Sequence, residues 1–118
     1  MQYLFLSPEH WKGFDCLMHN DQTSWDDKER ISLFYIIAGS DDLYSKHSYI
    51  YDFKEHAIKL CIDSGEVDFS SGMRALIRLG FNLYNGYRDS YSTPIDIFCN
   101  LDSNNLLLAH NAVRIRFR

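Results

Sequence analysis

Apolar residues recur every three or four positions along most of the chain, which is the spacing of one face of an amphipathic helix. Several of these segments follow a side chain that can cap a helix, or a proline suited to its first turn. The pattern predicts helices over 8–19, 25–38, 46–63, Asp68 to Gly86, 94–100 and 104–115. Ser40 is expected to begin a further short turn of helix.

The last six residues, 113–118, alternate apolar and basic side chains. This period of two favours a strand, and the apolar residues 2–6 would be its natural partner. A chain of 118 residues has room for one domain but not two. We therefore expect an all-α fold in which 1–118 form a single globular domain of five or six helices, with a two-strand clasp of the N- and C-termini.

Gly80 lies within the apolar stripe of its predicted helix, where glycine costs about 1 kcal/mol relative to alanine. A close helix crossing would explain why the position lacks a side chain. We expect that the helix over 25–38 crosses there, through Phe34 or Ile37. Gly39 is expected to stop that helix.

Composition and charge narrow the function classes. The hydrophobic fraction of 46% can form a core, and the net charge of −4 does not favour a protein that coats nucleic acid. The three cysteines contain no CxxC pair, so a disulfide framework or structural zinc site is not expected, and neither is a cofactor. No segment looks like a signal peptide or a membrane span, so we expect a cytoplasmic protein.

Tyrosine is unusually frequent, with eight residues in the chain. Tyrosine rings are rigid and amphipathic, and they are common anchors at protein interfaces. No organised catalytic motif competes with this interpretation. We therefore predict a protein-binding module, and leave open whether it dimerises. The expected partner contacts are Tyr44, Tyr51, Tyr84, Tyr87 and Arg88.

A small metal-dependent enzyme is the first alternative. Asp52 and His56 are four residues apart, so on a helix they would share one face with Glu55, and His47 would lie nearby. Divalent metals bind such sets of histidine and carboxylate. However, the chain has no HExxH motif, and the same residues also fit a solvated helix face with local charge pairs.

Nucleic-acid binding is the second alternative, and it is not favoured. Arg74 and Arg78 lie one helical turn apart, and Arg114, Arg116 and Arg118 end the chain. A continuous basic surface formed by these residues would bind phosphates. A helix start with nearby arginines can also hold an anion.

Four segments resemble an uncharacterised family of small proteins from Gram-positive bacteria and their phages. These segments are DDLYSK at 41–46, IYDF at 50–53, RALIRLGFNLYNG at 74–86 and NAVRIRF at 111–117. The resemblance implies a single cytosolic domain and brings no catalytic residues with it. A phage or mobile-element setting implies an accessory protein that binds a host protein, such as an inhibitor of a CRISPR nuclease or another defence complex.

Overall fold

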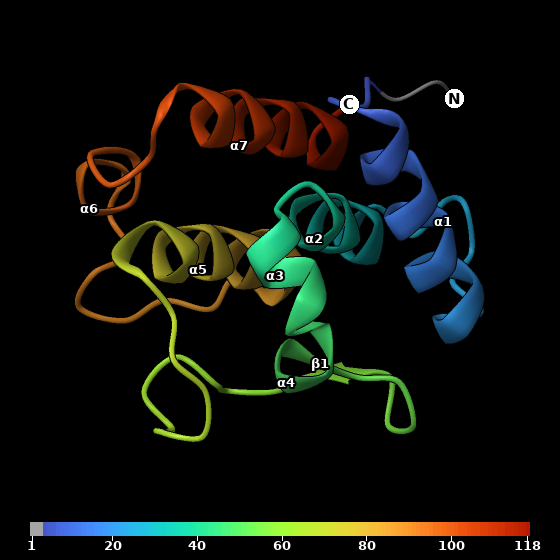
Figure 1. Cartoon of the computed structure of the whole chain (residues 1–118), viewed down its shortest axis with the longest axis horizontal. Coiled ribbons are helices and arrows are strands. Elements are labelled where there is room, and N and C mark those ends of the chain that lie inside the picture. The colour runs from blue at the N-terminus through green and yellow to red at the C-terminus, as the bar shows by residue number, and fades with distance from the viewer. Residues whose placement is uncertain (1–3) are drawn as a thin grey trace.

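The computed structural model describes residues 4–118, and within them the chain forms seven helices and one short hairpin (Figure 1). The elements are α1 (Pro8–Asp21), α2 (Lys28–Ala38), α3 (Asp41–Ser45), α4 (His47–Ile50), β1 (Tyr51–Asp52), β2 (Ala57–Ile58), α5 (Ser71–Asn85), α6 (Pro94–Phe98) and α7 (Ser103–Arg116). The all-α fold predicted from the sequence is confirmed.

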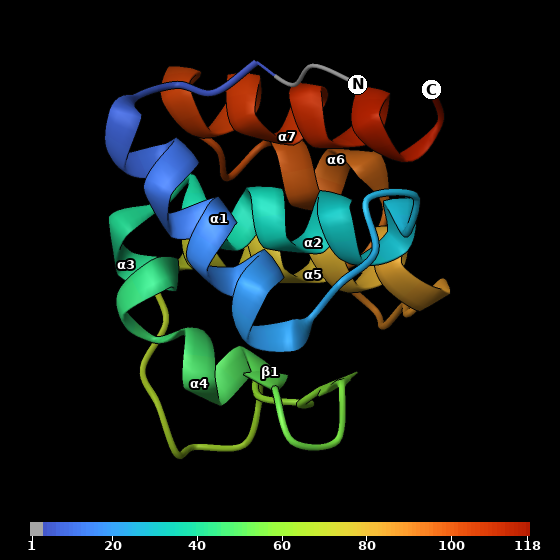
Figure 2. The same cartoon turned by 90° about the vertical axis from the view of Figure 1, so that its right-hand side faces the viewer.

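Helix α2 is the centre of the fold. Every residue from Ile31 to Ala38 is buried, because α1, α5 and α7 all pack against this helix. Figure 2 shows α1 in front of α2, α7 above it and α5 behind it. A helix that is apolar all round needs such cover on every side. Among residues 4–118, no helix is both long enough and apolar enough to cross a membrane.

Side-chain caps fix where the helices begin. Ser7 and Thr93 accept hydrogen bonds from backbone N–H groups in the first turns of α1 and α6, and a proline follows each cap. These two starts match the sequence prediction. Asp27 caps α2 and Ser70 caps α5, so both helices begin slightly later than expected.

The helix predicted over 46–63 is wrong. Helix α4 ends at Ile50, and β1 then pairs antiparallel with β2. The side chain of Asp52 accepts hydrogen bonds from the backbone N–H groups of Lys54 (2.9 Å) and Glu55 (3.1 Å). This local turn competes with helical hydrogen bonding and reverses the chain.

The two-strand clasp of the termini is also wrong, because the short sheet lies within 51–58 and α7 continues to Arg116. Leu108, Ala112 and Ile115 are buried at helical spacing, and this packing overrides the alternating pattern at the end of the chain. Residues 2 and 3 of the expected partner strand lie outside the described residues, and residues 4–6 are not in a strand.

The close crossing at Gly80 is confirmed, but its contacts differ from those expected. A Cβ on Gly80 would lie 2.9 Å from Cδ1 of Leu33 and 3.7 Å from Cδ1 of Ile36. Both residues belong to α2. Leu33 and Ile36 each precede a predicted contact, Phe34 or Ile37, by one residue. The prediction therefore named the correct helix but the wrong face of it.

A buried histidine links α1 to α2. The backbone N–H of Leu6 donates to Nδ1 of His10 (3.1 Å), and Nε2 of His10 bonds to the carbonyl of Tyr35 (2.9 Å). Nδ1 therefore accepts and Nε2 donates, which is the neutral form of the ring. Burial lowers the pKa of His10.

We expect this histidine to make the fold less stable in mild acid. Below about pH 6.5 the unfolded chain binds a proton that the folded His10 resists, so the free energy of unfolding falls as the pH decreases. Urea denaturation at about pH 7.5 and pH 5 measures the loss. The fall in the free energy of unfolding between these two pH values should be smaller in His10→Gln than in the parent. His110→Gln, which alters an exposed histidine of α7, is the control and should show the same fall as the parent. An equal loss of stability in His10→Gln and the parent would contradict the claim that buried His10 causes the destabilisation in acid.

Candidate functional site

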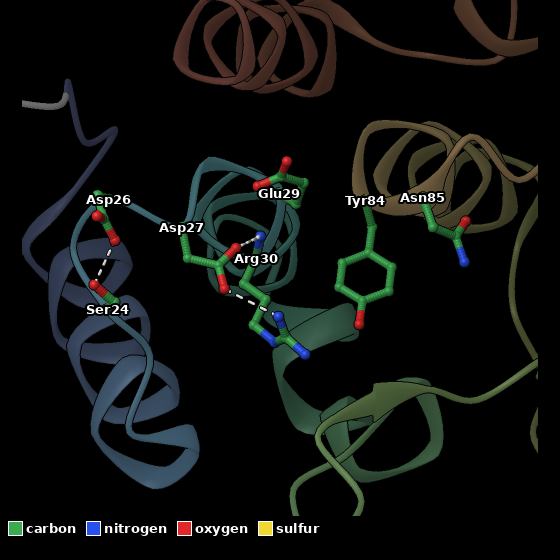
Figure 3. A pocket seen from close by; sticks show the side chains of 7 residues that line it. All are labelled: Ser24, Asp26, Asp27, Glu29, Arg30, Tyr84 and Asn85. Atoms are coloured by element: carbon green, nitrogen blue, oxygen red, sulfur yellow. Dashed lines mark hydrogen bonds and ion pairs between the residues drawn. The ribbon is translucent and has the colours of Figure 1, made fainter.

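An open pocket of about 660 Å³ lies between the start of α2 and the end of α5 (Figure 3). Its lining residues are Ser24, Asp26, Asp27, Glu29, Arg30, Tyr84 and Asn85. One wall comes from the α1–α2 loop and the first turn of α2. The other wall is the last turn of α5, which lies at the end of the RALIRLGFNLYNG segment, 74–86.

Carboxylates dominate the lining of this pocket. Asp27 accepts a hydrogen bond from Nη1 of Arg30 (2.9 Å), so these two charges neutralise each other. Asp26 accepts from the hydroxyl of Ser24 and is otherwise exposed. The side chain of Glu29 is 46% exposed, and its only ion-pair contact among residues 4–118 is a long one, 3.6 Å to Arg116. The pocket therefore keeps an excess of negative charge toward solvent.

Arg30 is held in place on several sides. Its Nε donates to the hydroxyl of Tyr51 (2.9 Å), and its Nη2 donates to the carbonyl of His56 (2.7 Å). The guanidinium also lies 5.4 Å from the ring centre of Tyr84, within the range of a cation–π contact. Arg30 is therefore part of the pocket wall and is not a free cation.

Beneath this wall lies a buried carboxylate, Asp21, whose side chain is only 2% exposed. Its Oδ1 accepts from the hydroxyl of Tyr51 (2.9 Å) and from Nδ1 of His56 (2.7 Å). Its Oδ2 accepts from Thr23 and lies 3.5 Å from Nε of Arg30. Burial of the hydroxyl raises the pKa of Tyr51. These bonds join the end of α1, the start of α2 and the hairpin.

His56 has a backbone φ of +54°, in the left-handed region that most side chains avoid. Both its ring and its carbonyl are hydrogen-bonded, which accounts for the retained strain. A carboxylate next to a histidine can also orient a catalytic base. However, His56 does not line the pocket. We therefore assign the network around Asp21 to holding the pocket walls together.

The expected partner contacts have different environments. Tyr84 lines the pocket, Arg88 is exposed, and Tyr44 and Tyr87 are half-buried. Tyr51 was expected at the surface, but it is only 1% exposed. Its ring packs against other aromatic rings and its hydroxyl bonds inside the protein, so it cannot serve as a contact in this conformation.

The proposed metal ligands are not brought together. Among residues 4–118, no group of three or more histidine, cysteine, aspartate or glutamate side chains could hold a metal ion. Nδ1 of His47 bonds to the carbonyl of Tyr44, while Asp52 stabilises its own turn. The spacing of Asp52 and His56 suggested a shared face only on the assumption of a helix, which is absent here.

The arginines proposed for nucleic-acid binding lie in two separate places. Arg116 donates to the carbonyl of Leu83 (2.7 Å), near the end of α5. Arg74 lies near the start of that helix, about 13 Å away along the helix axis. Arg114 and Arg118 are exposed near the end of α7.

Arg78 is paired, so its charge is largely neutralised. Its Nε donates to both carboxylate oxygens of Asp89, at 2.9 and 3.2 Å. Partial burial opposes ionisation of Asp89, but the hydrogen bonds from Arg78, Tyr91 and neighbouring groups hold its pKa at about 2. Asp89 is thus a fixed anion that ties the loop after α5 to the helix.

All three cysteines are free thiols. Cys61 is buried, and burial raises its pKa to about 11. Cys16 and Cys99 are exposed.

Sequence reasoning missed most of the pocket. Asp26 and Asp27 lie just before α2, where acids favour the start of a helix, and this local role gives no sign that they line a pocket. Nothing near Asp21 in the sequence indicates that its partners are Tyr51 and His56. The exception is Tyr84, which the tyrosine pattern did select.

The features above define a small helical protein with an acidic pocket beside a buried central helix. The chain belongs to DUF6075, a family of unknown function, whose family model matches residues 1–118. Neither a curated protein nor a solved structure matches the chain.

Proposed function

We propose that this protein is a protein-binding module whose acidic pocket receives a lysine or arginine side chain of its partner. The observation that carries the proposal is the pocket lining, where Asp26 forms no ion pair within residues 4–118 and Glu29 has only the long contact with Arg116. Tyr84 lines the same pocket. Complementary charge at an interface guides association and excludes wrong partners.

Trp25 supplies an apolar anchor beside the pocket. It lies in the loop between the lining residues Ser24 and Asp26, and it is 53% exposed. Its ring centre lies 6.0 Å from that of the buried Phe14, so the core supports one side of the ring. Tryptophan is among the residues most enriched at binding hot spots. A supported ring also loses little side-chain entropy on binding.

The partner that we propose is a host protein with a basic surface. Proteins that bind nucleic acid carry such surfaces. In a phage or mobile element, a small acidic protein that covers one could inhibit a defence complex, such as a CRISPR nuclease. The chemistry of the pocket supports this role over the metal-dependent enzyme and the nucleic-acid binder, because the residues suggested for those functions do not converge.

Site-specific cross-linking can identify the partner. A photo-cross-linking amino acid replaces Trp25 in one variant and Ile95 in a control. Ile95 is 75% exposed on α6, away from the pocket. Expression in the native host should give a cross-linked protein for position 25 and none for position 95. A cross-link to a second copy of this chain would show a dimer interface and contradict the host-partner proposal.

Binding measurements with the purified partner then test the pocket. We expect Trp25→Ala to weaken binding about thirtyfold, the loss typical of a hot-spot residue. Asp26→Asn should weaken it several-fold, mainly through slower association, and reduce its dependence on salt. Ile95→Ala and Glu66→Gln are matched controls on exposed residues outside the pocket. Equal affinities for Asp26→Asn and Glu66→Gln would contradict the proposal.

A further inference from the structure

A second pocket, of about 430 Å³, lies near the start of α5 and the end of α6. Its lining residues are Asp63, Ser71, Arg74, Arg78, Tyr91, Asp96, Cys99 and Asn100. None of these residues belongs to the acidic pocket, so the two pockets are distinct.

Arg74 is the unusual group in this second pocket. Its Nε is buried and has no hydrogen-bond partner, the one such side-chain nitrogen or oxygen within residues 4–118. An unmade bond at a buried polar atom is costly, because the atom has lost its water and gained no partner. No ion pair involving Arg74 forms within the described part of the chain. Proteins rarely keep a buried donor unsatisfied. The Arg74 side chain as a whole is only half-buried and lines the pocket, so a small turn of the guanidinium toward a bound ligand would supply the missing partner.

The other charged groups in the lining have partners or face solvent. Arg78 is bound to Asp89 and lies 5.3 Å from the ring centre of Tyr91. Asp96 accepts a hydrogen bond from Thr93 at the start of α6. Asp63 is exposed. The pocket therefore offers one guanidinium whose hydrogen-bonding capacity is unused.

We propose that this second pocket binds a carboxylate through Arg74. A guanidinium is a planar fork of N–H donors that matches the two oxygens of a carboxylate. A carboxylate is a monoanion, so it meets less repulsion from the lining residues Asp63 and Asp96 than a more highly charged anion would. A phosphate dianion would bring a second negative charge close to Asp63 and Asp96, and would be repelled. The carboxylate can belong to a small organic acid or to the C-terminus of a peptide.

The side chain of Ser71 and the close approach of α6 shape the rest of this site. A Cβ on Gly72 would lie 3.3 Å from the backbone oxygen of Asn100, so the start of α5 and the end of α6 are in close contact there. Ser71 and Cys99 line the same pocket as Arg74. This arrangement places Arg74 in a formed recess and not on a flat surface.

NMR titration of the full chain tests the proposal through the Nε–H signal of Arg74. The probes are acetate, N-acetyl-diglycine with a free C-terminus, the same peptide with an amidated C-terminus, and inorganic phosphate. We expect a saturable shift with the first two, with a Kd of about 1–10 mM, and none with the amide. A peptide that binds about tenfold tighter than acetate would identify a chain end as the ligand, while equal affinities would identify the carboxylate alone.

Two variants and a control complete the test. Arg74→Gln should abolish the shifts of neighbouring backbone signals, and Arg74→Lys should weaken binding because it keeps the charge but loses the fork. Arg88→Gln, an exposed arginine outside this pocket, should bind as the parent does. Absence of a saturable shift in the parent, tighter binding of phosphate, or unchanged binding in Arg74→Gln would each overturn the proposal. The parent titration decides the matter even if a variant fails to fold.

Discussion

Replacing Asp21 by asparagine is expected to lower the free energy of unfolding by about 3 kcal/mol. The amide has the shape of the carboxylate but removes its charge, and it places an N–H₂ group where an acceptor is needed. Tyr51, His56 and Arg30 all lose a charged partner. We expect a value at the low end of the range for breaking a buried ion pair, because Arg30 and His56 are partly exposed and can be hydrated.

Asp15→Asn is the matched control for this measurement. Asp15 forms an ion pair with His19 at 3.3 Å, but both side chains are more than a third exposed. Such a surface pair is typically worth less than about 1 kcal/mol. Urea denaturation of the two variants should therefore separate them clearly. Similar losses would mean that the network around Asp21 does not hold the pocket walls together.

The network can also be tested by a double-mutant cycle. Tyr51→Phe removes the hydroxyl that bonds to both Asp21 and Arg30. Because the three groups share hydrogen bonds, the double variant Asp21→Asn/Tyr51→Phe should lose less stability than the two single losses added together. Simple additivity would indicate that the contacts act independently.

Gly39→Ala is expected to destabilise the fold by about 3 kcal/mol, the upper end of the cost of overpacking a core. A Cβ at this position would lie 2.2 Å from Cδ1 and 2.9 Å from Cδ2 of Leu108, and 3.1 Å from Cε1 of His10. Leu108 is fully buried, so it has little room to move. The φ of Gly39 is −82°, a value that alanine adopts readily. The loss is therefore steric and does not come from the backbone.

Two further variants test this explanation through thermal or urea denaturation. Leu108→Ala creates space at the contact, so adding Gly39→Ala to it should cost much less than Gly39→Ala costs alone. Gly80→Ala should cost only about 1 kcal/mol, because its nearest contact is the terminal methyl of Leu33 at 2.9 Å and the helix itself gains stability. A larger loss for Gly80→Ala than for Gly39→Ala would contradict the packing described here.

Gly39 illustrates what the sequence pattern could not provide. It was expected to stop α2, and it does follow the last residue of that helix. Its backbone is right-handed, however, and the need for glycine comes from Leu108 on a distant helix. Local rules can indicate where a helix ends, but contacts between elements that are remote in sequence determine which side chains fit there.

Helices with a strong apolar period and a clear cap were predictable, as α1 and α6 show at Ser7 and Thr93. The segment 46–63 was not, because the apolar spacing of Tyr49, Ile50 and Phe53 suits a helix or a hairpin that packs on α2. The turn formed by Asp52 decides between them, together with the burial of Tyr51 against Phe34. Periodicity alone cannot distinguish such short alternatives.

The candidate site was predictable only in part. Tyr84 was selected as a contact, and it does line the acidic pocket. Asp26 and Glu29 could not be assigned to the same pocket as Tyr84 from sequence, because that pocket exists only once α2 packs against α5. Sequence gave no reason to expect that the exposed Trp25 would lie at the edge of this pocket.

A charge exchange across the interface tests the central claim most directly. Once cross-linking has identified the partner's basic residue, its affinity is measured for the parent and for Asp26→Lys, with Glu66→Lys as the control for charge. We predict that Asp26→Lys weakens binding at least tenfold, and that replacing the partner's basic residue by glutamate restores most of the loss. An equal loss in Glu66→Lys, or no recovery after the exchange, would show that the pocket does not receive a basic side chain.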